Sequence, residues 1–273
     1  MRVAESINVV FFAFLLVLAM VGWPARRRLR IIAIGALAIG PIVAVQFLPR
    51  FLAPLSASVV RDWLPAPILL MAYWQVGQFF TKPNEKLQTK LQRFDERLFE
   101  VFRRLPWPSR ARGWIRTYLE LAYLLCYLLV PFGLGLLYLM HMRRYAEEFW
   151  AVVLPPTYLC YGMVPLLPTL PPRALAGESS LSLPSTKLRV LNLWVLRHAS
   201  IQANTFPSAH VAASVAVALE LLRRAPWAGA AYLWVAISIA LGAVAGRYHY
   251  AADAILGAGL ALTGFLVASR AFV

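Results

Sequence analysis

The feature that most constrains this chain is a series of apolar blocks, each about as long as a membrane-spanning helix. Eight such segments lie at residues 5–23, 31–48, 64–80, 116–140, 149–169, 207–222, 227–246 and 250–269. Hydrophobic residues make up 60% of the 273 residues and charged residues only 14%, whereas soluble domains are roughly half apolar and about a quarter charged. This composition excludes a cytosolic domain, a disordered tail and a secreted disulfide scaffold. It predicts an all-α fold, a polytopic membrane helix bundle with eight spans.

The net charge of +15 comes from basic residues that flank the apolar blocks. In a soluble protein such a charge would suggest a nucleic-acid partner. Loops beside a bilayer, however, collect Lys and Arg because anionic lipid headgroups attract them. We therefore expect membrane lipids, and no nucleic acid, as partners. The sequence indicates no particular oligomeric state.

The segment 84–104 combines apolar and basic residues in a regular pattern. Its apolar residues recur at helical spacing and are Leu87, Leu91, Phe94, Leu98 and Val101. Basic side chains occupy much of the remaining helical wheel, which is typical of an amphipathic helix lying in the headgroup layer. A solvated helical hairpin is the alternative interpretation.

Three polar clusters lie at the ends of predicted spans, where a bilayer penalises unpaired polar groups. They are Pro171-Pro172-Arg173, Phe206-Pro207-Ser208-Ala209-His210, and Arg247-Tyr248-His249-Tyr250 followed by Asp253. If all eight segments cross the membrane, the three clusters emerge on the same side. The topology therefore predicts that they converge on one pocket.

The second cluster has the composition of a helix start, because proline fits the first turn, where its missing N–H is not needed. The backbone N–H groups of Ser208, Ala209 and His210 would then point out of the helix end, and such an end binds phosphate well. The Ser208 hydroxyl would add another donor. A helix start with a chance histidine is the structural alternative.

In the third cluster, His249 and Asp253 are four residues apart, so on a helix they share a face and can form a hydrogen bond. A carboxylate on one imidazole nitrogen fixes the tautomer and leaves the other nitrogen as a nucleophile or base. The guanidinium of Arg247 has a fork of donors that could clamp phosphate oxygens. An Arg–Asp pair buried for packing is the alternative.

A PSxH helix start followed about forty residues later by R-x-H-Y-x-x-D is similar to the motifs of the type 2 phosphatidic acid phosphatase superfamily. The R-x-H-Y form resembles most the branch that includes inositol-phosphorylceramide and sphingomyelin synthases. The resemblance covers roughly residues 64–273 and implies a six-helix phosphatase-like core. We expect residues 1–50 to form an added N-terminal transmembrane hairpin. Residues 51–273, with the interfacial helix 84–104, would form the catalytic membrane domain.

The resemblance implies a phosphohistidine mechanism. His249 would attack phosphorus while Asp253 orients its ring, and His210 would protonate the leaving oxygen and then activate water or an alcohol. Such a site also needs fixed positive charge and donors around the phosphoryl oxygens. By resemblance these groups are Arg173, Arg247, Ser208 and the backbone of Ala209. No cofactor is implied, and the sequence has no His, Cys and Asp set at metal-ligand spacing.

The sequence departs from the family pattern at the first motif, a lysine seven residues before an arginine-proline pair. Leu166 stands at the lysine position, and Ala174 follows Arg173 where the family has proline. The serine-arginine pair that often precedes the third motif is replaced by Gly242-Ala243. By resemblance, Arg247 would substitute for the arginine of that pair.

We expect an integral-membrane lipid phosphate phosphatase that hydrolyses a phosphate monoester or diphosphate of a lipid. A phosphotransferase that moves a phospho-headgroup between lipids is the alternative. A non-catalytic lipid transporter or scaffold is the alternative from another class. Of the 27 Lys and Arg residues, 19 lie on the side of the motifs and 8 on the other side. The positive-inside rule then puts the active site at the cytoplasmic face, and we expect a multi-pass protein of the bacterial inner membrane.

Overall fold

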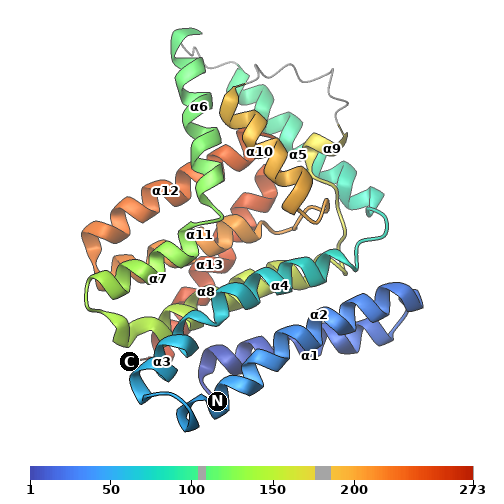
Figure 1. Ribbon diagram of the computed structural model, residues 1–273. Helices are drawn as coiled ribbons and strands as arrows, with labels where there is room; N and C mark the ends of the chain where they lie inside the picture. Colours follow the sequence, from blue (N-terminus) through green and yellow to red (C-terminus); the bar gives the residue numbers. More distant parts are fainter. Residues whose placement is uncertain (104–108, 176–185, 273) are drawn as a thin grey trace.

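The computed structural model describes residues 1–103, 109–175 and 186–272. Within these ranges the chain is helical apart from turns, loops and one antiparallel bridge between Thr169 and Asn204 (Figure 1). The α-helices are α1 (Val3–Met20), α2 (Ala25–Ala44), α3 (Pro54–Trp63), α4 (Pro65–Gly77), α5 (Glu85–Arg103), α6 (Ser109–Leu125), α7 (Leu129–Leu139), α8 (Ala146–Gly162), α9 (Pro172–Leu175), α10 (Lys187–Ala199), α11 (Ala209–Arg224), α12 (Pro226–Ala245) and α13 (Ala251–Ala271). Two short 3₁₀ helices are η1 (Val45–Arg50) and η2 (Arg143–Tyr145). The all-α prediction is confirmed.

Several helices are long and apolar enough to cross a membrane. Within the described ranges these are Val3–Met20, Ala25–Arg50, Pro54–Gly77, Pro226–Ala245 and Ala251–Ala271. A sixth span results if α6 and α7 are counted together, although the chain bends by 71° between them. The other two predicted segments correspond to α8 and α11, which have only 17 and 16 residues. The chain is therefore a polytopic membrane helix bundle, in which five or six of the described segments have the length and hydropathy of a full span and α8 and α11 are shorter.

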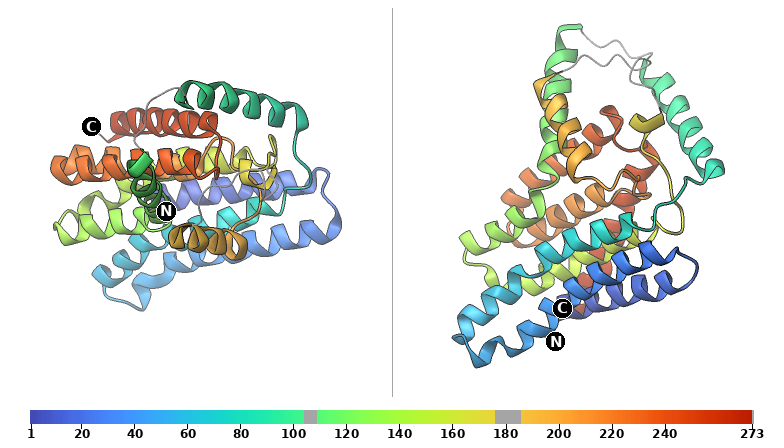
Figure 2. Two further views of the ribbon diagram at one scale, coloured as in Figure 1. Left: turned by 90° about the horizontal axis from the view of Figure 1, so that it is seen from above. Right: turned by 45° about the vertical axis from the view of Figure 1, so that its right-hand side comes forward.

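α11 packs against α8, α12 and α13 in the interior of the bundle (Figures 1 and 2). Small side chains make this packing close, since Ala212 and Ala216 of α11 are fully buried. The contact with α13 is tightest at Gly257, where an added Cβ would lie 2.5 Å from the Ser208 carbonyl oxygen. The starts of α11 and α13 are therefore held next to each other.

The N-terminal hairpin packs onto the remaining helices through α1 against α8 and α2 against α4. Phe11 stacks on Tyr158 of α8 with ring centroids 4.1 Å apart, and the Tyr158 hydroxyl donates a hydrogen bond to Asn8. Phe12 and Leu15 are fully buried beside them. One hydrophobic core thus extends from the hairpin into the rest of the bundle.

Ion pairs close the end of the bundle that lies at the C-terminus of α11. Asp62 accepts from Arg2 and Arg143, and Glu148 accepts from two arginines that end α11, Arg223 and Arg224. Both carboxylates are buried, and two arginines on each offset the cost of removing the charge from water. Residues at the N-terminus of α11 therefore belong to the opposite end of the bundle.

The segment 84–104 forms a helix, α5, over almost the predicted range, and this helix packs beside α13 (Figure 2). Its buried face contains Gln88, Leu91 and Asp95, whereas Phe94 is 43% exposed. The predicted apolar stripe is therefore only part of the packed face, because two polar side chains turn inward. The position of α5 in the headgroup layer stays a prediction.

Candidate active site

The three polar clusters meet at one end of the bundle. The side chains of Arg173, His210 and His249 line one cavity of about 20 Å³, which has room for about one water molecule. The backbone N–H of Ser208 donates to the carbonyl of Asp253 at 2.9 Å and so joins the second cluster to the third. Residues far apart in the sequence thus form one site.

Asp253 holds the ring of His249 in place. The aspartate is fully buried in the first turn of α13, and its Oδ2 lies 3.3 Å from Nδ1 of His249. The same oxygen accepts hydrogen bonds from the Tyr250 backbone N–H at 3.0 Å and from Nδ2 of Asn204 at 2.8 Å. With Nδ1 donating to this carboxylate, Nε2 of His249 keeps its lone pair.

The charge state of His249 also leaves its Nε2 lone pair free. His249 lies in the turn between α12 and α13 and is 5% exposed. Burial, followed by the positive charge of Arg173, lowers the pKa of His249 to about 3. The imidazole is therefore neutral at neutral pH, which is the form that can attack an electrophile.

A second imidazole faces the first. His210 is the second residue of α11, and its ring lies edge to face with that of His249, with centroids 5.7 Å apart and planes at 79°. Tyr123 and Tyr127 contact the His210 ring edge to face at 6.0 and 5.5 Å. The site therefore places two histidines from separate elements on one cavity, as a nucleophile and a general acid require.

Ser208 and Ala209 form the start of α11 but are not among the described residues that line the cavity. Ser208 is the N-cap residue, and its hydroxyl accepts a hydrogen bond from the Val211 N–H at 3.4 Å, a common role of serine at this position. The N–H of Ala209 donates to Oγ1 of Thr205 at 3.3 Å. The N–H groups expected to be open at Ser208 and Ala209 thus have acceptors within the protein.

Of the two arginines predicted to hold phosphate, Arg173 lines the cavity. Its Nη1 donates to the Tyr248 carbonyl at 3.3 Å. Arg247 has a left-handed backbone with a φ of 62°, and its side chain turns toward α5. There its guanidinium lies 3.8 Å from Asp95 and over the ring of Phe99. The structure thus brings Arg173 to His210 and His249, but not the guanidinium of Arg247.

Sequence reasoning missed Asn204, which ties the Asp253 carboxylate to the loop of Thr169. Besides its bond to Asp253, Nδ2 of Asn204 donates to Oγ1 of Thr169 at 3.1 Å, and its N–H donates to the Thr169 carbonyl at 2.9 Å. Asn204 is 1% exposed. Its position four residues before Ser208, in the same loop as the second motif, is the signal that could have identified it.

Sequence reasoning also missed two buried polar groups on α5. Gln88 donates to the Tyr250 hydroxyl and to the Leu170 carbonyl. Asp95 Oδ1 accepts from the N–H of Ala251 at 2.9 Å, and burial raises the pKa of Asp95 to about 6. α5 therefore supports the residues that follow His249, Tyr250 and Ala251.

The groups gathered at the cavity are two imidazoles, a carboxylate and a guanidinium. Such a set can attack phosphorus, transfer a proton and stabilise negative charge on phosphoryl oxygens. In the described ranges no three His, Cys, Asp or Glu side chains are grouped so that they could hold a metal ion.

Comparison with known families agrees with the motifs. The family model described as PAP2 superfamily matches residues 89–267, more than half of the chain. Comparisons with curated proteins and with solved structures gave no match. The matched region contains the residues of the cavity from Tyr123 onward and leaves α1–α4 outside. PAP2 denotes the type 2 phosphatidic acid phosphatases, so the match supports a phosphatase-like function, and the chain belongs to the PAP2 superfamily.

Proposed function

We propose that this protein is an integral-membrane lipid phosphate phosphatase that cleaves a phosphate monoester or diphosphate of a lipid. The observation that carries the proposal is the cavity where a neutral His249, held by Asp253, faces His210 and Arg173. These are the parts that phosphoryl transfer needs, namely a nucleophile, a proton donor and fixed positive charge. The family supports the same class of reaction.

The reaction would proceed in two displacements. In the first, Nε2 of His249 forms a bond to phosphorus as the bond to the leaving oxygen breaks, and His210 gives that oxygen its proton. Burial lowers the pKa of His210 in the empty cavity, so the negative charge of the bound phosphate is what would favour its protonated form. The positive charge that develops on the His249 ring is stabilised by Asp253 at 3.3 Å. In the second, His210 takes a proton from water while the water oxygen displaces His249, which releases phosphate and restores both rings. Arg173 would stabilise the phosphoryl oxygens in both steps.

The surroundings of the cavity favour an amphiphilic substrate. His210 and Asp253 lie in the first turns of two apolar helices, α11 and α13, so the cavity lies at the level where a bilayer begins. A lipid would keep its chains among the helices and present its phosphate at the helix ends. The excess of Lys and Arg on this side favours the cytoplasmic face of a bacterial inner membrane.

A phosphotransferase is the second candidate, favoured by the sequence Arg247-Tyr248-His249-Tyr250, which has the R-x-H-Y form of the synthase branch. The first displacement would be unchanged. In the second, His210 would take its proton from the hydroxyl of a lipid alcohol instead of water. The two candidates therefore differ only in the acceptor.

The test is to purify the protein in detergent and measure inorganic phosphate released from short-chain phosphatidic acid and from a polyprenyl diphosphate. His249→Ala is the control for contaminating phosphatases. Release by the wild type that is lost in the variant would establish the phosphatase. If release is absent, adding diacylglycerol or ceramide tests transfer. Neither release nor transfer, with folded protein, would overturn both proposals and favour a non-catalytic lipid transporter or scaffold.

A further inference from the structure

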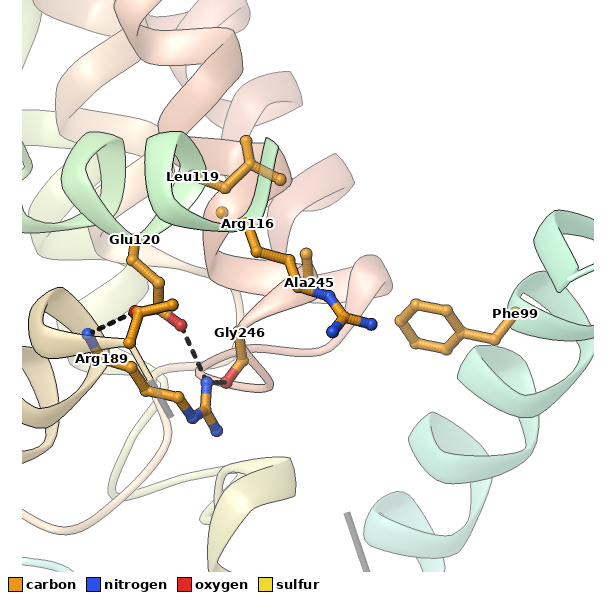
Figure 3. Close-up of a pocket in the computed structure, with 9 residues that line it drawn as sticks. Phe99, Arg116, Leu119, Glu120, Arg189, Ala245 and Gly246 are labelled. Atoms are coloured by element: carbon orange, nitrogen blue, oxygen red, sulfur yellow. Dashed lines mark hydrogen bonds and ion pairs between the residues drawn. The ribbon is translucent and has the colours of Figure 1, made fainter. Parts of the chain in front are cut away.

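A second and larger cavity lies next to the one at His249. Its volume is about 220 Å³, enough for several water molecules. It opens between α5, α6, α10 and the end of α12 (Figure 3). The lining residues are Phe99, Arg116, Leu119, Glu120, Thr186, Arg189, Gly242, Ala245 and Gly246.

The charged residues that line this cavity are two arginines and one glutamate, so a net positive charge remains. Glu120 is buried and accepts hydrogen bonds from Arg189 at 2.9 Å, from Asn192 at 2.7 Å and from the Tyr248 hydroxyl. Arg189 therefore neutralises Glu120. Arg116 forms no ion pair or hydrogen bond with any residue that the structure describes, and its guanidinium points into the cavity toward Phe99 (Figure 3). One positive charge is left for a ligand.

The rest of the lining is mainly apolar. The Phe99 ring and the Leu119 and Ala245 side chains form the walls on either side of Arg116 (Figure 3). A planar guanidinium binds phosphate through two parallel hydrogen bonds, and apolar walls suit the glycerol or chain that follows the phosphate in a lipid. An amphiphile with a phosphate headgroup matches both features.

This cavity shares structure with the catalytic one. Arg189 Nη1 donates to the carbonyl of Gly246, which precedes the turn of His249, and its guanidinium lies 5.8 Å from the ring centroid of Tyr248. Tyr248 itself lines the His249 cavity. A ligand at Arg116 would thus lie one residue layer away from the reacting groups.

We propose that the cavity lined by Arg116, Arg189 and Phe99 binds a phosphate-bearing headgroup that is not the one cleaved at His249. This places a second anionic group, on the substrate itself or on a neighbouring lipid, beside the catalytic turn. The kind of ligand rests on the proposed function, but the binding does not require turnover. The proposal therefore extends the substrate class to lipids with two anionic groups or to pairs of anionic lipids.

Binding can be measured apart from catalysis. The full-length His249→Ala protein in detergent is titrated with dioctanoyl phosphatidic acid, dioctanoylglycerol and inorganic phosphate by isothermal calorimetry. Arg116→Gln is introduced into this background, and since Arg116 has no hydrogen-bond or ion-pair partner among the described residues, the substitution breaks no such bond there. Arg97→Gln is the matched control, because Arg97 is an exposed arginine on the neighbouring helix α5.

We expect Arg116→Gln to weaken phosphatidic acid binding by about tenfold or more, the effect of losing a charge-assisted contact, and Arg97→Gln to leave it unchanged. Dioctanoylglycerol should bind more weakly than phosphatidic acid. Equal effects of the two variants, or equal affinity for both lipids, would overturn the proposal. Inorganic phosphate bound as tightly as the lipid would overturn the assignment to a lipid headgroup. If the wild-type protein releases no phosphate while binding to the His249→Ala protein depends on Arg116, the proposed function would be refuted and this site would stand.

Discussion

The contact of α13 with α11 sets the geometry of the site, and Gly257→Ala tests this directly. A Cβ at residue 257 would lie 2.5 Å from the carbonyl oxygen of Ser208. Ordinary contact begins at about 3.4 Å, so the two helices must separate by about 0.9 Å in this closely packed region. His249 and Asp253 move with α13 and His210 moves with α11, so the separation would pull the two imidazoles apart.

The expected magnitude follows from this displacement. Misplacing catalytic groups by about 1 Å can cost about a hundredfold in rate, so we expect a fall of that size in kcat. Overpacking costs about 1–3 kcal/mol of stability, while the helix propensity of alanine returns up to about 1 kcal/mol. The protein should therefore fold with a modestly lower Tm. Gly259→Ala is the matched control, since a Cβ there meets nothing within 4 Å.

The assay compares phosphate release from dioctanoyl phosphatidic acid, together with thermal unfolding, for the wild type and both variants in the same detergent. Gly257→Ala should unfold cooperatively and turn over slowly, and Gly259→Ala should match the wild type. If the two variants have kcat values within about threefold of each other, the close approach of α13 to α11 does not set the catalytic geometry. The reasoning would then be refuted.

Three other predictions follow from the partners of the catalytic groups. Asn204→Leu should lower kcat by about tenfold to a hundredfold, because it removes a hydrogen bond to the Asp253 carboxylate worth about 1.5–3 kcal/mol. Thr169→Val leaves that bond in place and should lower kcat less. Equal kcat values for Asn204→Leu and the wild type would contradict the role of Asn204 in holding Asp253. Folding lowers the pKa of His249 from 6.5 to about 3, so between these values the unfolded chain binds the proton and the folded protein does not. The stability present above pH 6.5 is therefore lost as the pH falls toward 3, and Tm should fall less on acidification in His249→Gln. Folding raises the pKa of Asp95 from 3.8 to about 6. Its contribution to the stability of the folded state is therefore present below pH 3.8 and is lost as the pH rises through 6. Between pH 4 and 7, Tm should decline less with rising pH in Asp95→Asn than in the wild type.

The convergence of the polar clusters on one cavity could be predicted from the sequence, because polar groups beside membrane spans are conspicuous. His210, His249 and Asp253 stand next to long apolar segments, where polar groups are costly without a function. The all-α membrane fold was also predictable, since an apolar block of about 20 residues has the length of a membrane-spanning helix. The length of each helix was not predictable in the same way, because α8 and α11 end after only 17 and 16 residues.

The supporting residues could not be predicted, because their partners are distant in the chain. Asp95 bonds the N–H of Ala251 across 156 positions, and no local pattern encodes such a pair. The two arginines illustrate a second limit. Arg173 and Arg247 have the same chemistry and both lie beside the motifs, but the left-handed backbone of Arg247 sends its guanidinium to α5. Side-chain direction depends on backbone angles that composition does not reveal.

A cavity of about 20 Å³ is smaller than a phosphoryl group, so substrate must widen it. The wall that contains His210 of α11 cannot give way easily, because Gly257 of α13 packs against the backbone at the start of α11. The facing wall includes α10, whose polar contacts are at its two ends: Tyr73 bonds Ser200 after its last residue, and Arg189 bonds Glu120 near its start. Between them, Leu196 packs in a small apolar cluster with Tyr123, Ala243 and Tyr248. A shift of α10 would widen the catalytic cavity and would at the same time move Arg189, which lines the Arg116 cavity. Occupancy of the Arg116 cavity and entry of phosphate at His249 are therefore expected to depend on the same helix.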